Sequence, residues 1–216
     1  MKQNTVIVAI GDSGKRIVSG IEYEYPKIMV NLEPKIEQDL IQIEVWDKNN
    51  IVVEKNLVKI YPKYNIHKNE DGTIFKFDLS TPYFLGDKED EIFDLLKEFE
   101  NVIFVVPLAD RSTREIFTAF ANLCADNNKQ ATIIAGMPLD FEGKKACKEA
   151  PELLKYIERK GLIDKYSYEN NSQSNLFSIK SVSYDYSNVG KDCTLLDVLG
   201  FTEEKTRKTL VEIIKG

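Results

Sequence analysis

The sequence predicts a three-layer α/β fold, in which helices cover both faces of a mostly parallel sheet. Short apolar runs at residues 5–10, 102–106 and 131–135 are typical of strands that are buried on both faces. Stretches with apolar residues at helical spacing follow these runs. The chain has 216 residues, of which 43% are hydrophobic, so it can bury one full core. Right-handed crossovers between such strands give a Rossmann-like sheet.

The first predicted unit is a strand, a turn and a helix. Residues 5–10 are a β-branched run that ends at Gly11, and the sequence Gly11-Asp12-Ser13-Gly14 turns the chain into a helix. Ile17, Val18 and Ile21 form the apolar stripe of this helix, and Pro26 follows its end. Residues 27–32 are expected to form the second strand.

Residues 41–79 are expected to be a β-rich insertion. Residues 41–47 alternate between apolar and polar, and Asn49-Asn50 is a turn signal that leads into a strand at 51–60. The polar residues 61–71 are expected to be irregular. Asp71-Gly72 marks another turn, before a strand at 73–79.

The second half alternates helices and strands more regularly. The helix expected at 112–126 has Ser112 as its N-cap, with Glu115 completing a capping box. The chain ends with a helix at 194–215, which we expect to be interrupted near Gly200. The other expected elements are a helix at 87–99, strands at 102–106 and 131–135, a helix at 143–159 and a strand at 172–183. No linker or repeat divides the chain, so residues 1–216 are expected to form a single domain.

Composition excludes several functional classes. The formal net charge of -6 argues against a general affinity for nucleic acid, which depends on a basic face. The sequence contains no apolar run of the roughly 18 residues that would cross a bilayer, and the apolar stretch at its start is too short for a secretory signal. We therefore expect a cytoplasmic protein with no membrane span.

Cysteine and histidine are scarce. Cys124, Cys147 and Cys193 form no CxxC pair, which predicts reduced thiols. His67 is the single histidine. Because histidine is a common ligand of transition metals, no metal site is expected.

Three loops are expected at the carboxyl ends of the parallel strands, where sheets of this kind bind ligands. They are residues 11–15, 107–113 and 137–142. The two glycines of the first loop permit a tight turn and expose amides at a helix N-terminus, which is a usable anion site. The simpler alternative is a turn that only starts a helix.

The segment 104–145 resembles the middle of the FtsZ/tubulin nucleotide-binding domain. It reads as a strand, a helix, a strand and then Pro138-Leu139-Asp140-Phe141-Glu142-Gly143, which is similar to the PFxFEG motif of that family. The start of the chain also aligns with the family's glycine-rich first loop, in which Gly11 and Gly14 are kept. The resemblance implies an FtsZ/tubulin GTPase-domain-like fold and GTP or GDP as the ligand to consider.

Several residues depart from the family pattern. Lys15 replaces a glycine, and Arg16 replaces an asparagine that contacts guanine. The glycine-rich phosphate loop is replaced by Pro107-Leu108-Ala109-Asp110-Arg111-Ser112-Thr113. Proline has no N–H, and the bulkier side chains would block a phosphate. Ser112 and Thr113 keep hydroxyls and Arg111 can pair with a phosphate, but a solvated helix N-terminus is the simpler interpretation.

The last two regions that match the family pattern each keep an acidic residue. Each lacks the second residue that contacts the nucleotide in the family. Glu142 stands where the family's glutamate contacts ribose, while Ala146 stands where an arginine contacts the nucleotide. In the closing helix, Leu199 replaces a phenylalanine that stacks on guanine, and Glu203 keeps an acceptor. The sequence stops at Gly216, where the family's helix would lead to its water-activating loop, so the resemblance implies no GTP hydrolysis.

Three functional hypotheses follow. The first is a divergent FtsZ/tubulin-like domain that does not hydrolyse GTP and acts by binding a protein partner or itself, as a monomer or a closed dimer. The aromatic residues of the insertion would then be a docking surface or a cover for the sheet: Trp46, Tyr61, Tyr64, Phe75 and Phe77.

The second hypothesis is a nucleotide-binding protein, or a weak GTPase completed by another chain. Its candidate binding residues are Gly11, Asp12, Ser13, Gly14, Lys15, Arg111, Ser112, Thr113, Glu142 and Glu203, with no catalytic residue assigned. The third is an unrelated Rossmann-like enzyme, which is disfavoured because GxGxxG is absent and no nucleophile–base pair surrounds His67.

Overall fold

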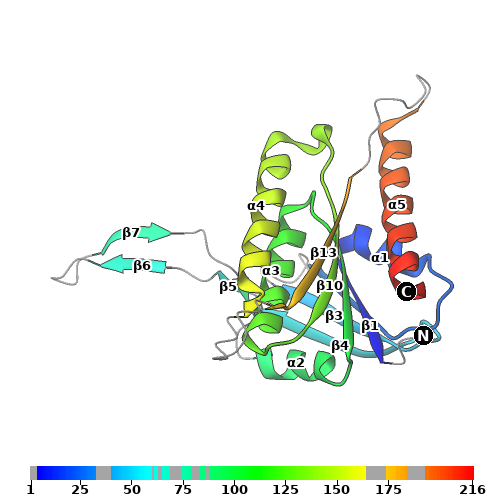
Figure 1. Ribbon diagram of the computed structural model, residues 1–216, viewed down its shortest axis with the longest axis horizontal. Helices are drawn as coiled ribbons and strands as arrows, with labels where there is room; N and C mark the ends of the chain where they lie inside the picture. The colour runs from blue at the N-terminus through cyan, green and yellow to red at the C-terminus, as the bar shows by residue number, and fades with distance from the viewer. Residues whose placement is uncertain are drawn as a thin grey trace.

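The computed structural model describes residues 4–32, 40–59, 61–62, 65–68, 74–78, 83–85, 88–163, 174–183 and 193–216. In these residues a seven-stranded sheet is covered by helices on both faces (Figure 1). The strand order is β13-β10-β9-β1-β2-β3-β4, and all neighbours from β13 to β2 are parallel. The predicted three-layer, Rossmann-like α/β architecture is therefore confirmed. The seven strands are β1 (Thr5–Ile10), β2 (Lys27–Leu32), β3 (Leu40–Trp46), β4 (Val52–Lys59), β9 (Asn101–Pro107), β10 (Ala131–Gly136) and β13 (Phe177–Val182).

Strand β1 lies at the centre of the parallel part of the sheet. Val8 is in register with Ile28 of β2 on one side and with Phe104 of β9 on the other. Every residue of β1 is buried, which is why the strand reads as an unbroken apolar run.

Among the described residues, five α-helices form the outer layers. Helices α1 and α5 cover one face of the sheet, over a core that includes Ile7, Val105 and Leu210. Helices α2, α3 and α4 cover the other face, where Phe104 of β9 makes edge-to-face contacts with Phe117 and Phe120 of α3. The helices are α1 (Gly11–Ser19), α2 (Glu89–Lys97), α3 (Arg111–Asp126), α4 (Lys144–Lys160) and α5 (Leu195–Lys215).

The first half of the predicted insertion is part of the main sheet. β3 pairs antiparallel with β2, and β4 pairs antiparallel with β3 at the sheet edge. The predicted turn between them is confirmed, and Asn50 adopts a φ of 62° there, a conformation that asparagine tolerates better than most residues. Trp46 packs against the face covered by α1. The side chains of Tyr61, Tyr64, Phe75 and Phe77 lie outside the described residues.

The prediction of irregular structure at 61–71 was wrong in the part that the structure describes. β5 (Tyr61–Pro62) pairs with β8 (Tyr83–Phe84), and β6 (Asn65–Lys68) pairs with β7 (Ile74–Asp78). The β6–β7 hairpin projects from the body of the molecule (Figure 1). Pairing with another strand satisfies the backbone of these polar residues, and polarity alone does not predict such pairing. The turn predicted at Asp71-Gly72 lies outside the described residues.

The closing helix is continuous, so the predicted interruption near Gly200 was wrong. Val198, Thr206 and Leu210 are buried on either side of this glycine, and their packing holds the helix together. A glycine inside a helix costs only about 1 kcal/mol relative to alanine, which tertiary packing readily offsets. The late strand expected at 172–183 is divided into β12 (Ser174–Asn175), which pairs with β11 (Leu162–Ile163), and β13.

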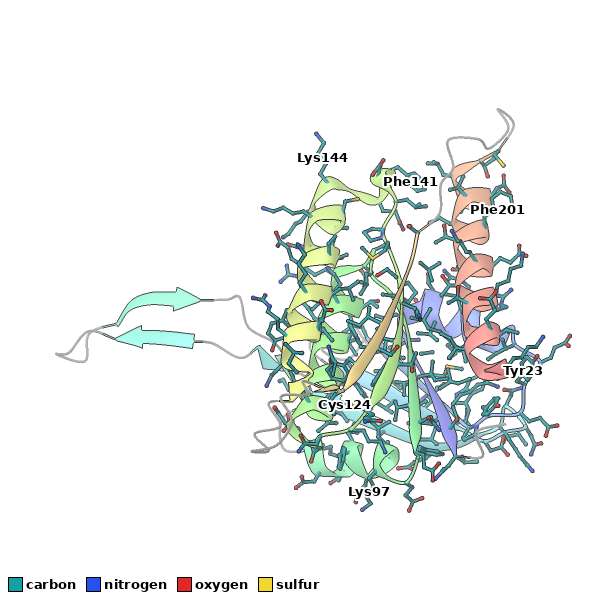
Figure 2. All side chains as sticks on the ribbon, in the orientation of Figure 1. Tyr23, Lys97, Cys124, Phe141, Lys144 and Phe201 are labelled. Carbon is teal, nitrogen blue, oxygen red and sulfur yellow. The ribbon has the colours of Figure 1, made fainter. Side chains whose placement is uncertain are left out.

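All three cysteines are free thiols. Cys124 lies inside the molecule (Figure 2), and burial raises the pKa of its thiol to about 12. Cys147 is half-buried and Cys193 is exposed. Among the helices of the described residues, none combines the length and the apolar character needed to cross a membrane.

Candidate switch-point site

A cavity of about 460 Å³ lies at the carboxyl ends of β1 and β9. The chain continues from β1 to β2 on one side and later returns to β9 on the other, so the strand order reverses here. Such a switch point is where open α/β sheets bind ligands. The cavity is lined by Ile10, Gly11, Asp12, Ser13, Asn31, Leu32, Pro107, Ala109, Asp110, Ser112, Thr113, Ile116 and Glu142.

The glycines of the first loop are explained by close packing. Gly11 has a φ of +78°, and a Cβ on it would lie 2.4 Å from Thr113 Oγ1. A Cβ on Gly14 would lie 3.0 Å from the carbonyl oxygen of Val105. Both glycines therefore let α1 begin directly against β9 and α3. Gly14 is buried behind the loop and does not line the cavity.

The second loop carries its own carboxylate at the N-terminus of α3. Asp110 is the N-cap, and its side chain accepts hydrogen bonds from the Thr113 amide at 3.1 Å, from Thr113 Oγ1 at 3.3 Å and from the Ser112 hydroxyl. The prediction of Ser112 as N-cap was wrong, because Asp110 reaches the helical amide first. Glu115 instead binds Arg111, at 2.6 Å.

A buried arginine holds this loop in place. The guanidinium of Arg114 donates to the carbonyl oxygens of Leu108 at 2.7 Å and Ala109 at 2.8 Å, and pairs with Glu149 of α4 at 2.8 Å. Its side chain is only 9% exposed. Since carbonyls point at Arg114, the loop is shaped by an internal cation and does not form the amide cradle of a phosphate loop.

The third loop contains a short 3₁₀ helix, η2 (Asp140–Glu142). Glu142 Oε2 accepts a hydrogen bond from the Leu139 amide at 2.7 Å, and Gly143 follows with a φ of 112°. Phe141 is 37% exposed and lies at the same end of the molecule as Phe201 of α5 (Figure 2). Ala146, which the resemblance in the sequence aligns with an arginine, is buried.

The predicted cationic ligands of the cavity do not line it. Lys15 pairs with Glu44 of β3 at 3.3 Å and lies over the Trp46 ring, 5.3 Å from its centroid. Arg111 extends along α3 to Glu115. Burial raises the pKa of Glu44, but hydrogen bonds from Trp46, Lys15 and Lys55 lower it below its ordinary value. Lys15 thus binds side chains of strand β3 and does not turn into the cavity.

Glu203, the acceptor predicted on the closing helix, is also bound elsewhere. Arg16 of α1 pairs with its carboxylate, with Nη2 at 2.6 Å and Nε at 3.1 Å from Oε1. This contact joins α1 to α5. Of the ten predicted binding residues, the structure gathers Gly11, Asp12, Ser13, Ser112, Thr113 and Glu142 around the cavity.

The cavity lining is rich in hydrogen-bond acceptors. Asp12, Asp110 and Glu142 bring carboxylates, and no lysine or arginine of the described residues lines it. Asn31 Nδ2 donates to Asp12 at 3.1 Å, while its Oδ1 is buried and has no hydrogen-bond partner in the described part of the chain. A phosphate entering here would face carboxylates, which is electrostatically unfavourable.

Sequence reasoning missed Asn31, which reaches the cavity from β2. A polar residue near the end of a buried parallel strand was the available signal. Asp110 was recognised only as a departure from the family loop. In the described residues, no group of three or more His, Cys, Asp or Glu side chains is arranged to hold a metal ion.

Replacing Asp110 with alanine is expected to lower the free energy of unfolding by about 1 kcal/mol at pH 7, the usual cost of losing an N-cap. Burial raises the pKa of Asp110, but hydrogen bonds from Ser112 and Thr113 outweigh it and hold that pKa below its ordinary value. The carboxylate therefore stabilises the fold above its unfolded pKa of about 3.9, and this contribution is lost as the pH falls through the folded pKa.

Urea denaturation of Asp110→Ala and of the unmodified chain, compared from pH 7 to pH 2.5, measures this contribution. The difference in stability should shrink with acidification. Replacement of the exposed Glu22, in the loop after α1, by alanine is the control and should show no such trend. A difference that stays constant down to pH 2.5 would show that the charge of Asp110 is not the stabilising feature.

Comparison of the sequence with models of known protein families gave no match, and comparison with curated proteins gave no significant match either.

Proposed function

We propose that this chain is a divergent FtsZ/tubulin-like domain that does not hydrolyse GTP and acts by binding a protein. One observation carries the proposal: the switch-point cavity is lined by the carboxylates of Asp12, Asp110 and Glu142, with no cation from the described residues. Phosphoryl transfer requires cations and amides that neutralise the phosphate oxygens. A lining of acceptors is the reverse of that arrangement.

The bonding of the neighbouring charges supports the same interpretation. Lys15 and Arg16 are engaged by Glu44 and Glu203, so the first loop offers no free cation. The carboxylate of Asp110 already accepts a hydrogen bond from the Thr113 amide at the N-terminus of α3. The chain therefore satisfies this anion site with its own side chain.

Exposed apolar side chains support protein binding as the mode of action. Strand β4, at the sheet edge, exposes Val52, Val53 and Leu57, and Ile51 just before it is 59% exposed. Leu195 and Leu196, in the first turn of α5, are 60% and 78% exposed. Exposed apolar side chains on a sheet-edge strand offer a surface on which a partner chain can pack.

Millimolar GTP or GDP with magnesium is expected to leave the thermal unfolding of this chain unchanged. A nucleotide present at 100 times its dissociation constant would stabilise the fold by about 2.7 kcal/mol, which a thermal scan detects readily. Magnesium alone is the control for effects of the ion. A shift with GTP or GDP that Ser13→Ala abolishes would contradict the proposal.

Nucleotide binding is the second candidate function, and the position of the cavity favours it. Hydroxyls of Ser13, Ser112 and Thr113 line a cavity between the N-termini of α1 and α3. In this alternative GTP or GDP is the ligand, and a partner chain completes a weak GTPase. The thermal titration decides between the two candidates.

A further inference from the structure

Each carboxylate of the switch-point cavity uses one oxygen inside the chain and keeps the other free. In Asp12, the side chain of Asn31 donates to Oδ1. In Asp110, all three donors at the start of α3 reach Oδ2. In Glu142, a loop amide donates to Oε2. Asp12 Oδ2, Asp110 Oδ1 and Glu142 Oε1 therefore accept no hydrogen bond from the described residues.

A buried amide oxygen at the same cavity also lacks a partner. Oδ1 of Asn31 is buried, and no donor in the described part of the chain reaches it. Nδ2 of the same amide is held by Asp12, so turning the amide over would bring two acceptor oxygens together. A buried acceptor without a partner is unfavourable, and a donor group that enters the cavity would satisfy it.

The neighbouring arginines do not neutralise this cavity. Arg16 is bound to Glu203 and Arg114 to Glu149, and neither arginine lines the cavity. Both attract its carboxylates only from outside, through space. The cavity thus combines three carboxylates, each with a free oxygen, and a negative potential that attracts cations.

The arrangement of these acceptors favours an extended organic cation over a single metal ion. In the part of the chain that the structure describes, no three carboxylates are grouped closely enough to hold a metal. The cavity of about 460 Å³ lies in the size range of small-ligand pockets, about 300–1,000 Å³. Methylene groups would find apolar surface beside the carboxylates, since five apolar residues line the cavity: Ile10, Leu32, Pro107, Ala109 and Ile116.

We propose that the switch-point cavity binds an aliphatic polyamine, a chain of methylene groups that carries two or more ammonium groups. The ammonium groups donate to the free oxygens of Asp12, Asp110 and Glu142, and one N–H satisfies Asn31 Oδ1. The methylene groups between them lie on the apolar lining. This small ligand is additional to the protein partner of the proposed function.

A lysine side chain of a protein partner offers the same alkylammonium chemistry, but with a single charge. Three carboxylates that do not converge on one point are better matched by a ligand with several separated charges. A comparison of the two kinds of ligand therefore identifies the source of the cation.

Isothermal titration calorimetry of the purified chain with spermidine tests the proposal. At low salt we expect a dissociation constant below about 1 mM, which rises when salt is added. N-acetyl-lysinamide, which carries one ammonium group, should bind at least about tenfold more weakly. Equal affinities would overturn the polyamine and identify a basic side chain as the ligand.

The combined substitutions Asp12→Asn and Glu142→Gln remove two of the free oxygens. Each amide keeps a carbonyl oxygen for the hydrogen bond inside the chain and places an NH₂ group where the free oxygen was. The double variant should weaken spermidine binding at least about tenfold. Thermal unfolding without ligand checks that it is folded, and Asp12→Asn alone, at an exposed position, gives the same comparison at smaller size.

Glu152→Gln combined with Glu158→Gln is the matched control. Both glutamates are exposed on α4 and lie outside the cavity lining, so this variant loses the same charge elsewhere. Its dissociation constant for spermidine should stay within about twofold of the original. Equal losses in the two double variants would show that spermidine responds only to the net charge, and would overturn the site.

No heat of binding with spermidine up to about 10 mM would also overturn the proposal. None of these results bears on the nucleotide titration. A thermal shift with GTP that Ser13→Ala abolishes would contradict the proposed function, whereas the polyamine site stands or falls on the spermidine titration alone.

Discussion

Replacing Phe104 with alanine is expected to lower the free energy of unfolding by about 4 kcal/mol, the largest effect that we expect from a single substitution in this chain. Phe104 is fully buried in β9. Its ring centroid lies 5.9 Å from that of Phe117 and 6.3 Å from that of Phe120, both edge-to-face. Alanine would remove the ring and leave a cavity between the sheet and α3, which a close-packed interior fills only in part.

Urea denaturation followed by the fluorescence of Trp46, the only tryptophan, measures this loss. Phe104→Leu keeps most of the volume and should cost roughly half as much. Phe201→Ala removes a phenylalanine from the exposed end of α5 and should change stability by less than about 1 kcal/mol. A loss below about 1 kcal/mol for Phe104→Ala would show that the ring is not central to the core.

Replacing Gly11 with alanine is expected to cost about 3 kcal/mol, from a strained backbone and a steric clash together. The backbone at Gly11 has a φ of +78°, which side chains disfavour, and the new Cβ would lie 2.4 Å from Thr113 Oγ1. Strand β1, helix α1 and helix α3 meet at this point, so no neighbour moves freely. The same urea denaturation gives the change in the free energy of unfolding.

A double-mutant cycle with Thr113→Ala separates the two causes. Thr113→Ala removes the atom in closest conflict, so Gly11→Ala should cost about 1–2 kcal/mol in that background, the part due to φ alone. Gly200→Ala is the control, since an added Cβ meets nothing there, and it should raise stability by up to about 1 kcal/mol. Equal costs of Gly11→Ala in both backgrounds would exclude the clash with Thr113.

The sheet was predictable because a parallel strand that is buried on both faces appears in the sequence as a continuous apolar run. The strands expected at 5–10 and 27–32 match β1 and β2 residue for residue. Their apolar runs exist because both faces are covered. The elements that were wrong are those that distant packing decides. Gly200 breaks no helix because the buried residues on either side of it hold α5 together.

The ends of elements were harder to predict than their presence. Asp110 and Ser112 are both good N-caps, and the sequence alone does not choose between them. The choice falls to Asp110 because Arg114 fixes the carbonyls of Leu108 and Ala109 and so sets where α3 begins. Strand β6 was missed because its partner β7 supplies the pairing, and the sequence of β6 alone does not record it.

For the candidate site, too, the sequence predicted the position of the loops but not the direction of their side chains. The order of strands and helices was enough to expect the three loops at the carboxyl edge of the sheet, and each loop contributes at least one residue to the cavity lining. Which side chains turn into the cavity depended on partners far along the chain. Lys15 is drawn to Glu44 and Arg16 to Glu203, which are 29 and 187 positions away.

By itself the sequence determined the α/β class, the positions of most strands and helices, and the absence of a glycine-rich loop at 107–113. These are local properties, because strand periodicity, helix spacing and the missing N–H of Pro107 are written in neighbouring residues. Only the tertiary structure decided the charge of the cavity and the direction of its neighbouring cations. Ion pairs and close approaches join residues that are adjacent in space and distant in the chain, so no local pattern records them.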